Sequence, residues 1–365
     1  MKHTKIVLVL LAVLILTGCT RYMQTEDNTV LRNEETGQRL VENILCKTET
    51  TVIEYERIRD GKIEDLIENL ENTELKEQIR ELQTNLEEET INEEEFYTEL
   101  KNLDENLYNR IVALNEQFDI SDVVYCTEFG ITTGGYEGIW SSFFVKPLAF
   151  LLIQVGEFTG NYGWGIVIVT ILIRTLLYPV TRKTVMQSEN MKKVQPKLKK
   201  LEEKYRNKKD QQAQVQKNQE MWKIYKENNV NPFGGCLFAF IQIPLFLSFF
   251  EALHRLPAVL EERFLGINLG ITPGTAFTNG QYHYILFVVL VVTATYFSFK
   301  FNPMSGMGQS NEKQMKMMMN FSIIMISISA FFISSGIALY WIINSGYTVA
   351  QNFIVKRRRK NDHIT

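Results

Sequence analysis

The chain has 365 residues, a net charge of −3 at pH 7 and 45% hydrophobic residues. This near-neutral total hides two parts of opposite sign, because residues 20–140 carry 11 Lys and Arg against 30 Asp and Glu, whereas residues 141–365 carry 26 against 12. Such a split excludes a single uniformly solvated domain and indicates that the two parts lie in different environments.

Residues 1–18 are typical of a bacterial lipoprotein signal peptide. Lys2 and Lys5 precede an apolar run over 6–16, which is too short for a comfortable membrane span. The sequence Leu-Thr-Gly-Cys that ends at Cys19 resembles a lipobox, and this resemblance implies cleavage before Cys19 and a lipid such as palmitate on its thiol. An uncleaved anchor helix is the alternative. In both cases the segment that follows leaves the cytoplasm.

Residues 19–138 are predicted to form an acidic, mainly helical extracytoplasmic domain. Apolar residues recur at helical spacing in two stretches between 60 and 118. Asn92 followed by Glu95 fits a capping box for the second stretch, so an antiparallel helical hairpin is the simplest structure. Residues 48–58 are rich in β-branched residues and could form a strand.

The cysteine pattern supports the hypothesis of a disulfide rather than a metal site. Cys46 and Cys126 bracket the acidic helices and lie on the oxidising side of the membrane. Cys236 falls in an apolar stretch, where a free thiol behaves as a small hydrophobic group. No CxxC or Cys/His cluster is present, so we expect no metal. For the acidic domain, docking of a partner, guidance of an exported chain and a solvated spacer all remain open.

Residues 139–160 are interpreted as an amphipathic helix lying along the outer membrane interface. The stretch is apolar but contains Lys146, Pro147 and Glu157, and it ends at Gly160. A full membrane span is the alternative.

Residues 161–356 predict a core of five transmembrane helices. Residues 317–355 hold no charged residue across 39 positions, and because one span needs about 20 residues, this run is two spans. The predicted spans are about 162–180, 232–253, 284–300, 317–333 and 336–355. The fold class is therefore an all-α polytopic membrane protein with five transmembrane helices, a cytoplasmic helical hairpin and an extracytoplasmic, mainly helical domain.

The distribution of Lys and Arg predicts the orientation. Loop 181–231 holds 14 of them, loop 300–316 holds 3 and the stretch 356–360 holds 5, whereas the connection 254–283 holds 2. The positive-inside rule places the basic loops and the basic tail, 357–365, in the cytoplasm and the acidic domain outside. Apolar residues at helical spacing within the first loop predict a basic helical hairpin over 182–229.

Arg174 lies within the first predicted span, where a cation costs roughly 3 kcal/mol or more. Thr170, Arg174 and Tyr178 share one helix face, and no Asp or Glu lies in the middle of any span. Other spans contribute polar side chains that would join this face, namely Gln242, Asn344 and Gln351. Arg174 either extends towards the cytoplasmic surface or lines a water-filled groove.

The region 139–356 resembles the YidC/Oxa1/Alb3 family of membrane protein insertases, in its Gram-positive lipoprotein form. The motifs are "GNYGWGIVIVTILIRTLLYPVTRKTVMQSENMKKVQPKLKKLEEKY", "NVNPFGGCLFAFIQIPLFLSFFEAL" and "LYWIINSGYTVAQN". Two features depart from the family. The turn "FFISSGIALYW" lacks the proline often found there, and the acidic domain has no counterpart whose role can be carried over.

The resemblance implies a bacterial cell-membrane insertase with a hydrophilic groove open to cytoplasm and lipid. Arg174 matches the family's groove arginine and would pair with the acidic tail of a nascent membrane protein. The implied partners are nascent membrane proteins, membrane lipid, a Sec translocon and, through the basic stretch 356–360, the ribosome. No cofactor is implied, and the chain contains no GxxxxGK[ST] nucleotide motif.

Two other function classes remain as alternatives. A small-solute secondary transporter would show internal repeats and helices broken at mid-membrane, for which Gly234-Gly235 and Pro244 are weak indications. A membrane-anchored adaptor would use the acidic domain as its working part. An enzyme is not expected, because the sequence offers no nucleophile–base pair and no metal set.

Overall fold

The computed structural model describes residues 20–25, 28–33, 36–207, 210–230, 234–301 and 312–362. The predicted signal peptide and lipidation site, residues 1–18 and Cys19, lie outside the described residues. The expectation of a mainly helical membrane protein is confirmed. Within the described residues the sheet structure is one short antiparallel hairpin, β1 Arg263–Phe264 with β2 Ile267–Asn268, besides isolated bridges.

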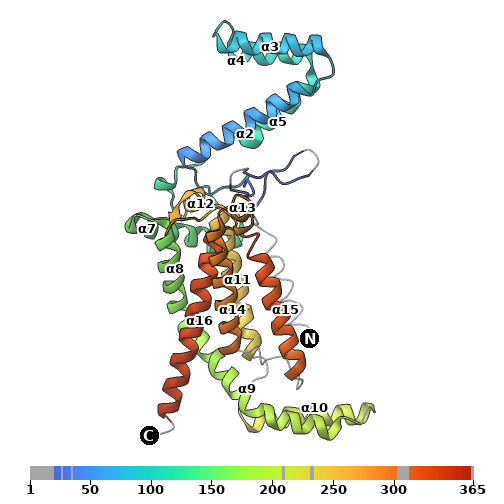
Figure 1. The fold of residues 1–365 in the computed structure, drawn as a ribbon, viewed down its shortest axis with the longest axis vertical. Helices are drawn as coiled ribbons and strands as arrows, with labels where there is room; N and C mark the ends of the chain where they lie inside the picture. Colours follow the sequence, from blue (N-terminus) through green and yellow to red (C-terminus); the bar gives the residue numbers. More distant parts are fainter. Residues whose placement is uncertain are drawn as a thin grey trace.

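The molecule has three parts arranged along its long axis (Figure 1). An arm of four helices, which we define as α2–α5, projects from one end of a helical bundle. The bundle contains α8 Tyr162–Leu176, α11 Gly234–His254, α14 Ile285–Phe301, α15 Glu312–Ser329 and α16 Ser335–Asp362. A third part, formed by α9 Tyr178–Tyr205 and α10 Gln211–Glu227, lies at the opposite end of the bundle, where α16 also ends.

The arm differs from the predicted two-helix hairpin, because its sequence contains additional helix stops. Its helices are α2 Glu49–Glu68, α3 Thr73–Glu87, α4 Glu93–Leu103 and α5 Glu105–Phe118. Asn72 caps α3 by accepting from two backbone N–H groups, and Asp104 ends α4 and caps α5 in the same way. The capping box of Asn92 and Glu95 at the start of α4 is confirmed.

The stretch 48–58 is helical, so the suggestion of a strand there is wrong. Thr48 caps α2 through a reciprocal pair of hydrogen bonds with Thr51. Tyr55 then buries its ring against Phe118 of α5 and donates its hydroxyl to the Val41 carbonyl at 2.7 Å. Tertiary packing therefore outweighs the weak strand preference of the β-branched residues.

Two apolar cores stabilise the arm, one at its base and one at its tip. The base core holds Met23, Val41 and Tyr55, and the tip core holds Ile79 and Leu100. The N-terminal stretch packs into the base core through isolated bridges such as Tyr22 to Val41. The arm is thus a folded unit with apolar cores of its own.

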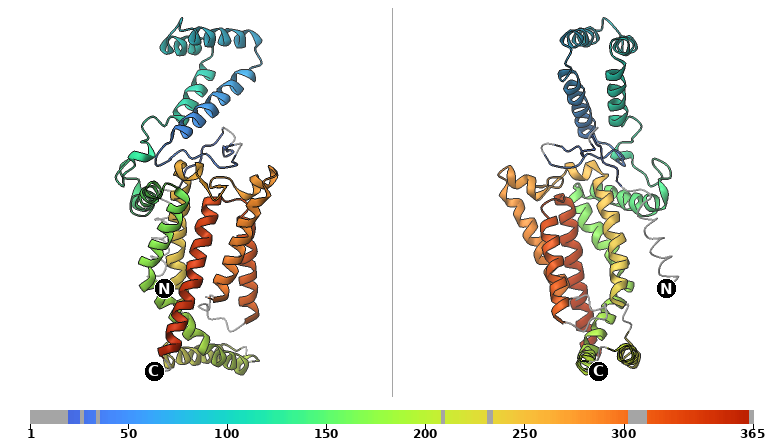
Figure 2. Two further views of the ribbon diagram at one scale, coloured as in Figure 1. Left: turned by 60° about the vertical axis from the view of Figure 1, so that its left-hand side comes forward. Right: turned by 90° about the vertical axis from the view of Figure 1, so that its right-hand side faces the viewer.

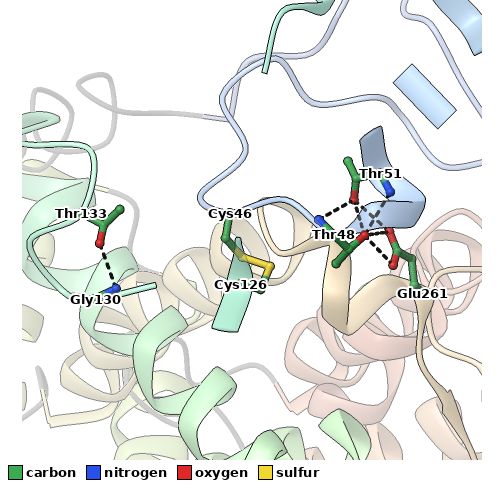
Figure 3. Close-up of a disulfide and its surroundings, with 7 residues drawn as sticks. All are labelled: Cys46, Thr48, Thr51, Cys126, Gly130, Thr133 and Glu261. Carbon is green, nitrogen blue, oxygen red and sulfur yellow. Dashed lines mark hydrogen bonds between the residues drawn. A yellow bond between two sulfur atoms is a disulfide. The ribbon is translucent and has the colours of Figure 1, made fainter. Parts of the chain in front are cut away.

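The neck of the arm is cross-linked where it joins the bundle. Cys46, before α2, and Cys126, in the short 3-10 turn Cys126–Glu128, form a disulfide that closes a loop of 80 residues (Figure 3). Beside it, the Thr48 hydroxyl donates to the carboxylate of Glu261 at 2.8 Å and the Thr51 hydroxyl at 2.9 Å. Glu261 ends the short helix α12 Pro257–Glu261, so the neck is tied to the connection that follows α11.

One helical stretch, Gly138–Thr159, runs across the arm end of the bundle rather than along it (Figure 2). It comprises α6 Gly138–Trp140, a π-turn Ser141–Val145 and α7 Lys146–Thr159. Gly160 ends α7 in the left-handed conformation, with φ 69°. Gly165 of α8 then allows close approach, since a Cβ there would lie 3.0 Å from the Leu152 carbonyl oxygen.

Two helical stretches in the described residues are each long and apolar enough to cross a membrane. They are Gly138–Thr159 and Tyr282–Phe301. The second comprises a 3-10 turn Tyr282–Tyr284 and α14, and it follows the short helix α13 Pro273–Thr278. The bent pair Tyr162–Leu176 and Tyr178–Met191 would form a third span.

The first predicted span, 162–180, is not one straight helix. It ends at Leu177, and the next helix, α9 Tyr178–Tyr205, leaves at 66°. Pro179 explains the break, because it lacks an N–H and its ring clashes with the carbonyl of residue 175 in a continuous helix. The helix that contains residue 182, the predicted start of the hairpin, accordingly begins at Tyr178, and Tyr178 no longer shares a continuous helix face with Arg174.

The hairpin at the far end of the bundle consists of α9 and α10 Gln211–Glu227. Asp210 caps α10 by accepting from the Ala213 N–H. Met191, Val194 and Tyr225 are buried between the helices. α16 also extends further than the predicted fifth span, since it continues to Asp362 and includes the basic stretch 356–360.

Candidate functional site

Arg174 is the centre of a buried polar site in the middle of the bundle. Its side chain is 2% exposed. The Nε–H donates to Oδ1 of Asn344 at 2.5 Å, and Nη2 donates to Oε1 of Gln242 at 2.6 Å. These three side chains come from α8, α16 and α11, so the guanidinium connects three helices. In this structure the Arg174 side chain therefore points to Asn344 and Gln242 and does not extend towards the cytoplasmic surface.

Both of these acceptors are neutral amide oxygens, so they accept from two of the five N–H groups of Arg174 without neutralising its charge. Burying a cation without a counter-charge costs free energy that two hydrogen bonds only partly recover. The arrangement can accept an anion, because a carboxylate would supply the same acceptor geometry together with the missing negative charge.

The other predicted site residues lie around this centre but do not contact Arg174. Thr170 is buried one turn earlier, and its hydroxyl donates to the Ile166 carbonyl of its own helix at 2.6 Å. Tyr178 is half-buried beyond the break at Leu177. Gln351 donates to the Thr181 hydroxyl at 2.8 Å and so joins α16 to α9 instead.

Thr181 is a site residue that the sequence analysis missed. It is 1% exposed and lies seven residues, or about two helical turns, after Arg174. Its partner Gln351 likewise follows Asn344 by seven residues along α16. This repeated spacing is a signal in the sequence that could have identified Thr181 and Gln351 as a second polar pair. The bend at Leu177 separates this pair from Arg174.

Aromatic packing closes the site on its arm side. Tyr340 of α16 stacks on Phe249 of α11, with ring centroids 4.2 Å apart. Trp341 donates its indole N–H to the Thr295 hydroxyl of α14 at 2.9 Å. Both contacts hold α16, which carries Asn344, against its neighbours.

A second buried polar cluster, which we call the neck cluster, lies where the arm meets the bundle. It consists of Glu137, Lys146, Glu251 and Arg255. Lys146 and Arg255 are each 1% exposed, and both form ion pairs with Glu137, at 3.0 and 2.5 Å. Lys146 lies in the stretch that the sequence predicts as an interfacial helix, and its buried Nζ also donates to the carbonyls of Thr133 and Gly135.

Acid is expected to weaken the neck cluster through Glu137. Burial opposes ionisation of this carboxyl, but hydrogen bonds and charges from Arg255 and Lys146 outweigh burial and hold its pKa below the ordinary 4.5. A lowered pKa stabilises the folded state above pH 4.5, and that stabilisation is lost as pH falls through the folded-state pKa. Thermal unfolding at pH 5.5 and 3.5 should show a smaller acid-induced loss for Glu137→Gln than for wild type. Equal losses would contradict the assignment.

Metal chemistry receives no support from the described residues. No group of three or more His, Cys, Asp or Glu among them is placed to hold an ion. Cys46 and Cys126 are bonded to each other, and the side chain of Cys236 lies outside the described set.

Fold and site together define a helical membrane protein that buries an arginine between three helices. Residues 154–362 match the 60Kd inner membrane protein family, and the chain belongs to that family. It is 37% identical over 225 residues to membrane protein insertase YidC 2 of Listeria innocua, covering 61% of this chain and 74% of the relative. The resemblance to the YidC/Oxa1/Alb3 insertases is thus confirmed.

Two further relatives agree. Membrane protein insertase MisCA of Bacillus subtilis is 37% identical over 218 residues, covering 60% of this chain and 79% of its own. Membrane protein insertase YidC of Oceanobacillus iheyensis is 33% identical over 238 residues, covering 64% of this chain and 90% of the relative. A crystal structure of an active YidC insertase gives a TM-score of 0.43 at 22% identity, covering 70% of this chain and 52% of that one. The family match begins at residue 154, so the arm lies outside it.

Proposed function

We propose that this membrane protein insertase receives the acidic or polar tail of its substrate at Arg174. One observation carries the proposal: among the described residues, the acceptors of a buried guanidinium, 2% exposed, are two neutral amides from α11 and α16. A binding site for an anionic segment needs a cation whose own partners can be replaced, and Asn344 and Gln242 are such partners.

Exchange of partners supplies the attraction. A carboxylate that replaces a neutral amide on the guanidinium adds the attraction between opposite charges to the hydrogen bond, and a low surrounding dielectric strengthens that attraction. A substrate carboxylate that displaces the Asn344 or Gln242 amide would therefore gain free energy. The displaced amides can bond to water that enters with the tail. Arg174 in this role is a transient acceptor and not a permanent ion pair.

Transfer of the substrate's apolar segment into lipid would then drive insertion, at about 0.8 kcal/mol per buried CH₂. Thr170, Tyr178 and Gln351 are proposed to line the hydrophilic groove through which the tail passes on its way to or from Arg174. The groove would open to the cytoplasm and to lipid. No nucleotide-dependent step is required by this scheme.

The proposed topology has five spans, the arm outside and the α9–α10 hairpin inside. The Lys and Arg distribution along the sequence supports it, as does the separation of arm and hairpin to opposite ends of the bundle (Figure 1). The cell-membrane location, the lipid on Cys19 and contacts of the basic stretch 356–360 with the ribosome, alone or beside a Sec translocon, are part of the same proposal.

Substrate charge provides the direct test. Purified protein in proteoliposomes is given single-span substrates that differ only in an N-terminal tail carrying Asp, Asn or Lys. We expect insertion to be fastest with Asp and slowest with Lys, and we expect Arg174→Lys to keep this order because it keeps the cation. If the three tails insert equally fast into wild type, Arg174 is not a charge acceptor and the proposal fails.

A further inference from the structure

Arg255, at the arm end of α11, joins three separate segments of the chain. Its Nε donates to the Asn43 carbonyl at 2.6 Å, Nη1 to the Ser141 hydroxyl at 3.0 Å and Nη2 to Glu137 at 2.5 Å. Its backbone carbonyl accepts from the Leu45 N–H at 2.8 Å. The N-terminal stretch of the arm, the π-turn before α7 and the end of α11 are therefore held together by one side chain.

The charges of the neck cluster balance. Lys146 and Arg255 supply two cations, and Glu137 and Glu251 supply two anions. Glu251 is buried as well, lies 3.5 Å from Arg255 and accepts from the Trp140 indole at 2.8 Å. Removing one member of such a cluster leaves an uncompensated buried charge, so the members hold each other in one geometry.

α11 connects the neck cluster to Arg174, because it carries Glu251 near one end and Gln242 further along. Thirteen residues, or about 20 Å of helix, separate Gln242 from Arg255. Pro244 lies between them and cannot donate a backbone hydrogen bond. The direction of α11 on either side of Pro244 therefore depends on packing against neighbouring helices. The stack of Phe249 on Tyr340 lies in the same interval and joins α11 to α16, the helix that bears Asn344.

We propose that Arg255 is a positioning residue for insertion. Through the neck cluster it fixes the arm end of α11. It thereby holds Gln242 of α11 and Asn344 of the adjoining α16 at the distances at which they accept hydrogen bonds from Arg174. Arg255 does not contact substrate. The proposal rests on the proposed function, since it explains how the acceptors of Arg174 are kept in place.

The test compares Arg255→Gln with Arg255→Lys, each alone and combined with Gln242→Ala. The readout is the ratio of insertion rates for the Asp-tailed and Asn-tailed substrates in proteoliposomes. A general structural defect lowers both rates and leaves this ratio unchanged. Glu137→Gln serves as a milder second variant, because the Glu137 side chain is 29% exposed.

We expect Arg255→Gln to reduce the ratio by about tenfold, equivalent to about 1.4 kcal/mol, and Arg255→Lys to restore part of it. Glu137→Gln should reduce the ratio in the same direction. In the Gln242→Ala background, Arg255→Gln should cause little further change, because coupled residues are not additive.

Two results would overturn the positioning role. One is an unchanged ratio in both Arg255→Gln and Glu137→Gln. The other is that Arg255→Gln lowers this ratio of insertion rates by the same factor in the Gln242→Ala background as in wild type. Failure of the proposed function itself looks different, since wild type would then show no preference for the Asp-tailed substrate.

Discussion

Replacing Arg174 with methionine is expected to reduce insertion of an Asp-tailed substrate by at least about tenfold while changing the free energy of unfolding by less than about 2 kcal/mol. The loss of insertion follows from the loss of a charge-assisted contact, which is worth roughly 1.5–3 kcal/mol. Methionine keeps an unbranched, flexible apolar side chain that is shorter than arginine, so it removes the charge and fills most of the space of the aliphatic stem.

The small stability change is the net of two opposing effects. A buried guanidinium without a counter-ion carries a desolvation cost of several kcal/mol, and removing it recovers part of that cost. The amide oxygens of Asn344 and Gln242 then lose their donor, which costs about 1–3 kcal/mol for each group that stays buried and unpaired. Because these terms are of similar size and opposite sign, activity and stability should separate.

Asn344→Asp is the matched control for this prediction. It preserves the shape of the side chain but places a resident carboxylate on the Arg174 Nε–H, where the amide oxygen lies at 2.5 Å. We expect this variant to be at least as stable as wild type and to insert the Asp-tailed substrate poorly, since the resident anion competes with the tail. Thermal unfolding in detergent and insertion rates in proteoliposomes measure both quantities. A methionine variant that is strongly destabilised, or one that inserts normally, would contradict the assigned role.

Polar periodicity within the apolar spans was enough to predict Arg174 as the central residue and Asn344 and Gln242 among its neighbours. It was not enough to predict which of the polar residues contact it. Gln351 and Tyr178 were grouped with Arg174 on the assumption of straight helices. The 66° bend after Leu177 places Tyr178 and Thr181 on another helix, and Thr181 then takes Gln351 as its partner.

Two other features of the structure depend on long-range contacts that the sequence pattern does not contain. The β-branched stretch 48–58 becomes helical because Tyr55 packs on Phe118, far along the chain. Lys146 is buried because the turn at 133–137 folds over it and supplies carbonyls and a carboxylate. Local patterns carry no information on such partners, whereas the capping box of Asn92 and Glu95 depends only on neighbouring residues and could be predicted.

The second large effect is expected at the neck of the arm. Replacing Cys46 and Cys126 together with serine should destabilise the arm by about 2 to 5 kcal/mol, because the disulfide closes a loop of 80 residues and so limits the freedom of the unfolded arm. Hydrogen exchange should accelerate in α2 and α5, which meet at the base core. Exchange in α8 and α14 should change less, since their contacts lie within the bundle.

Reduction of the wild-type protein provides the matched comparison. A reductant should reproduce the faster exchange in α2 and α5 of wild type and should have no effect on the double-serine variant. The arm retains its base core of Met23, Val41 and Tyr55 after the bond is broken, together with the bonds from Thr48 and Thr51 to Glu261 (Figure 3). If exchange in α2 and α5 is the same with and without the disulfide, these packing contacts alone hold the arm, and the cross-link contributes little to its stability.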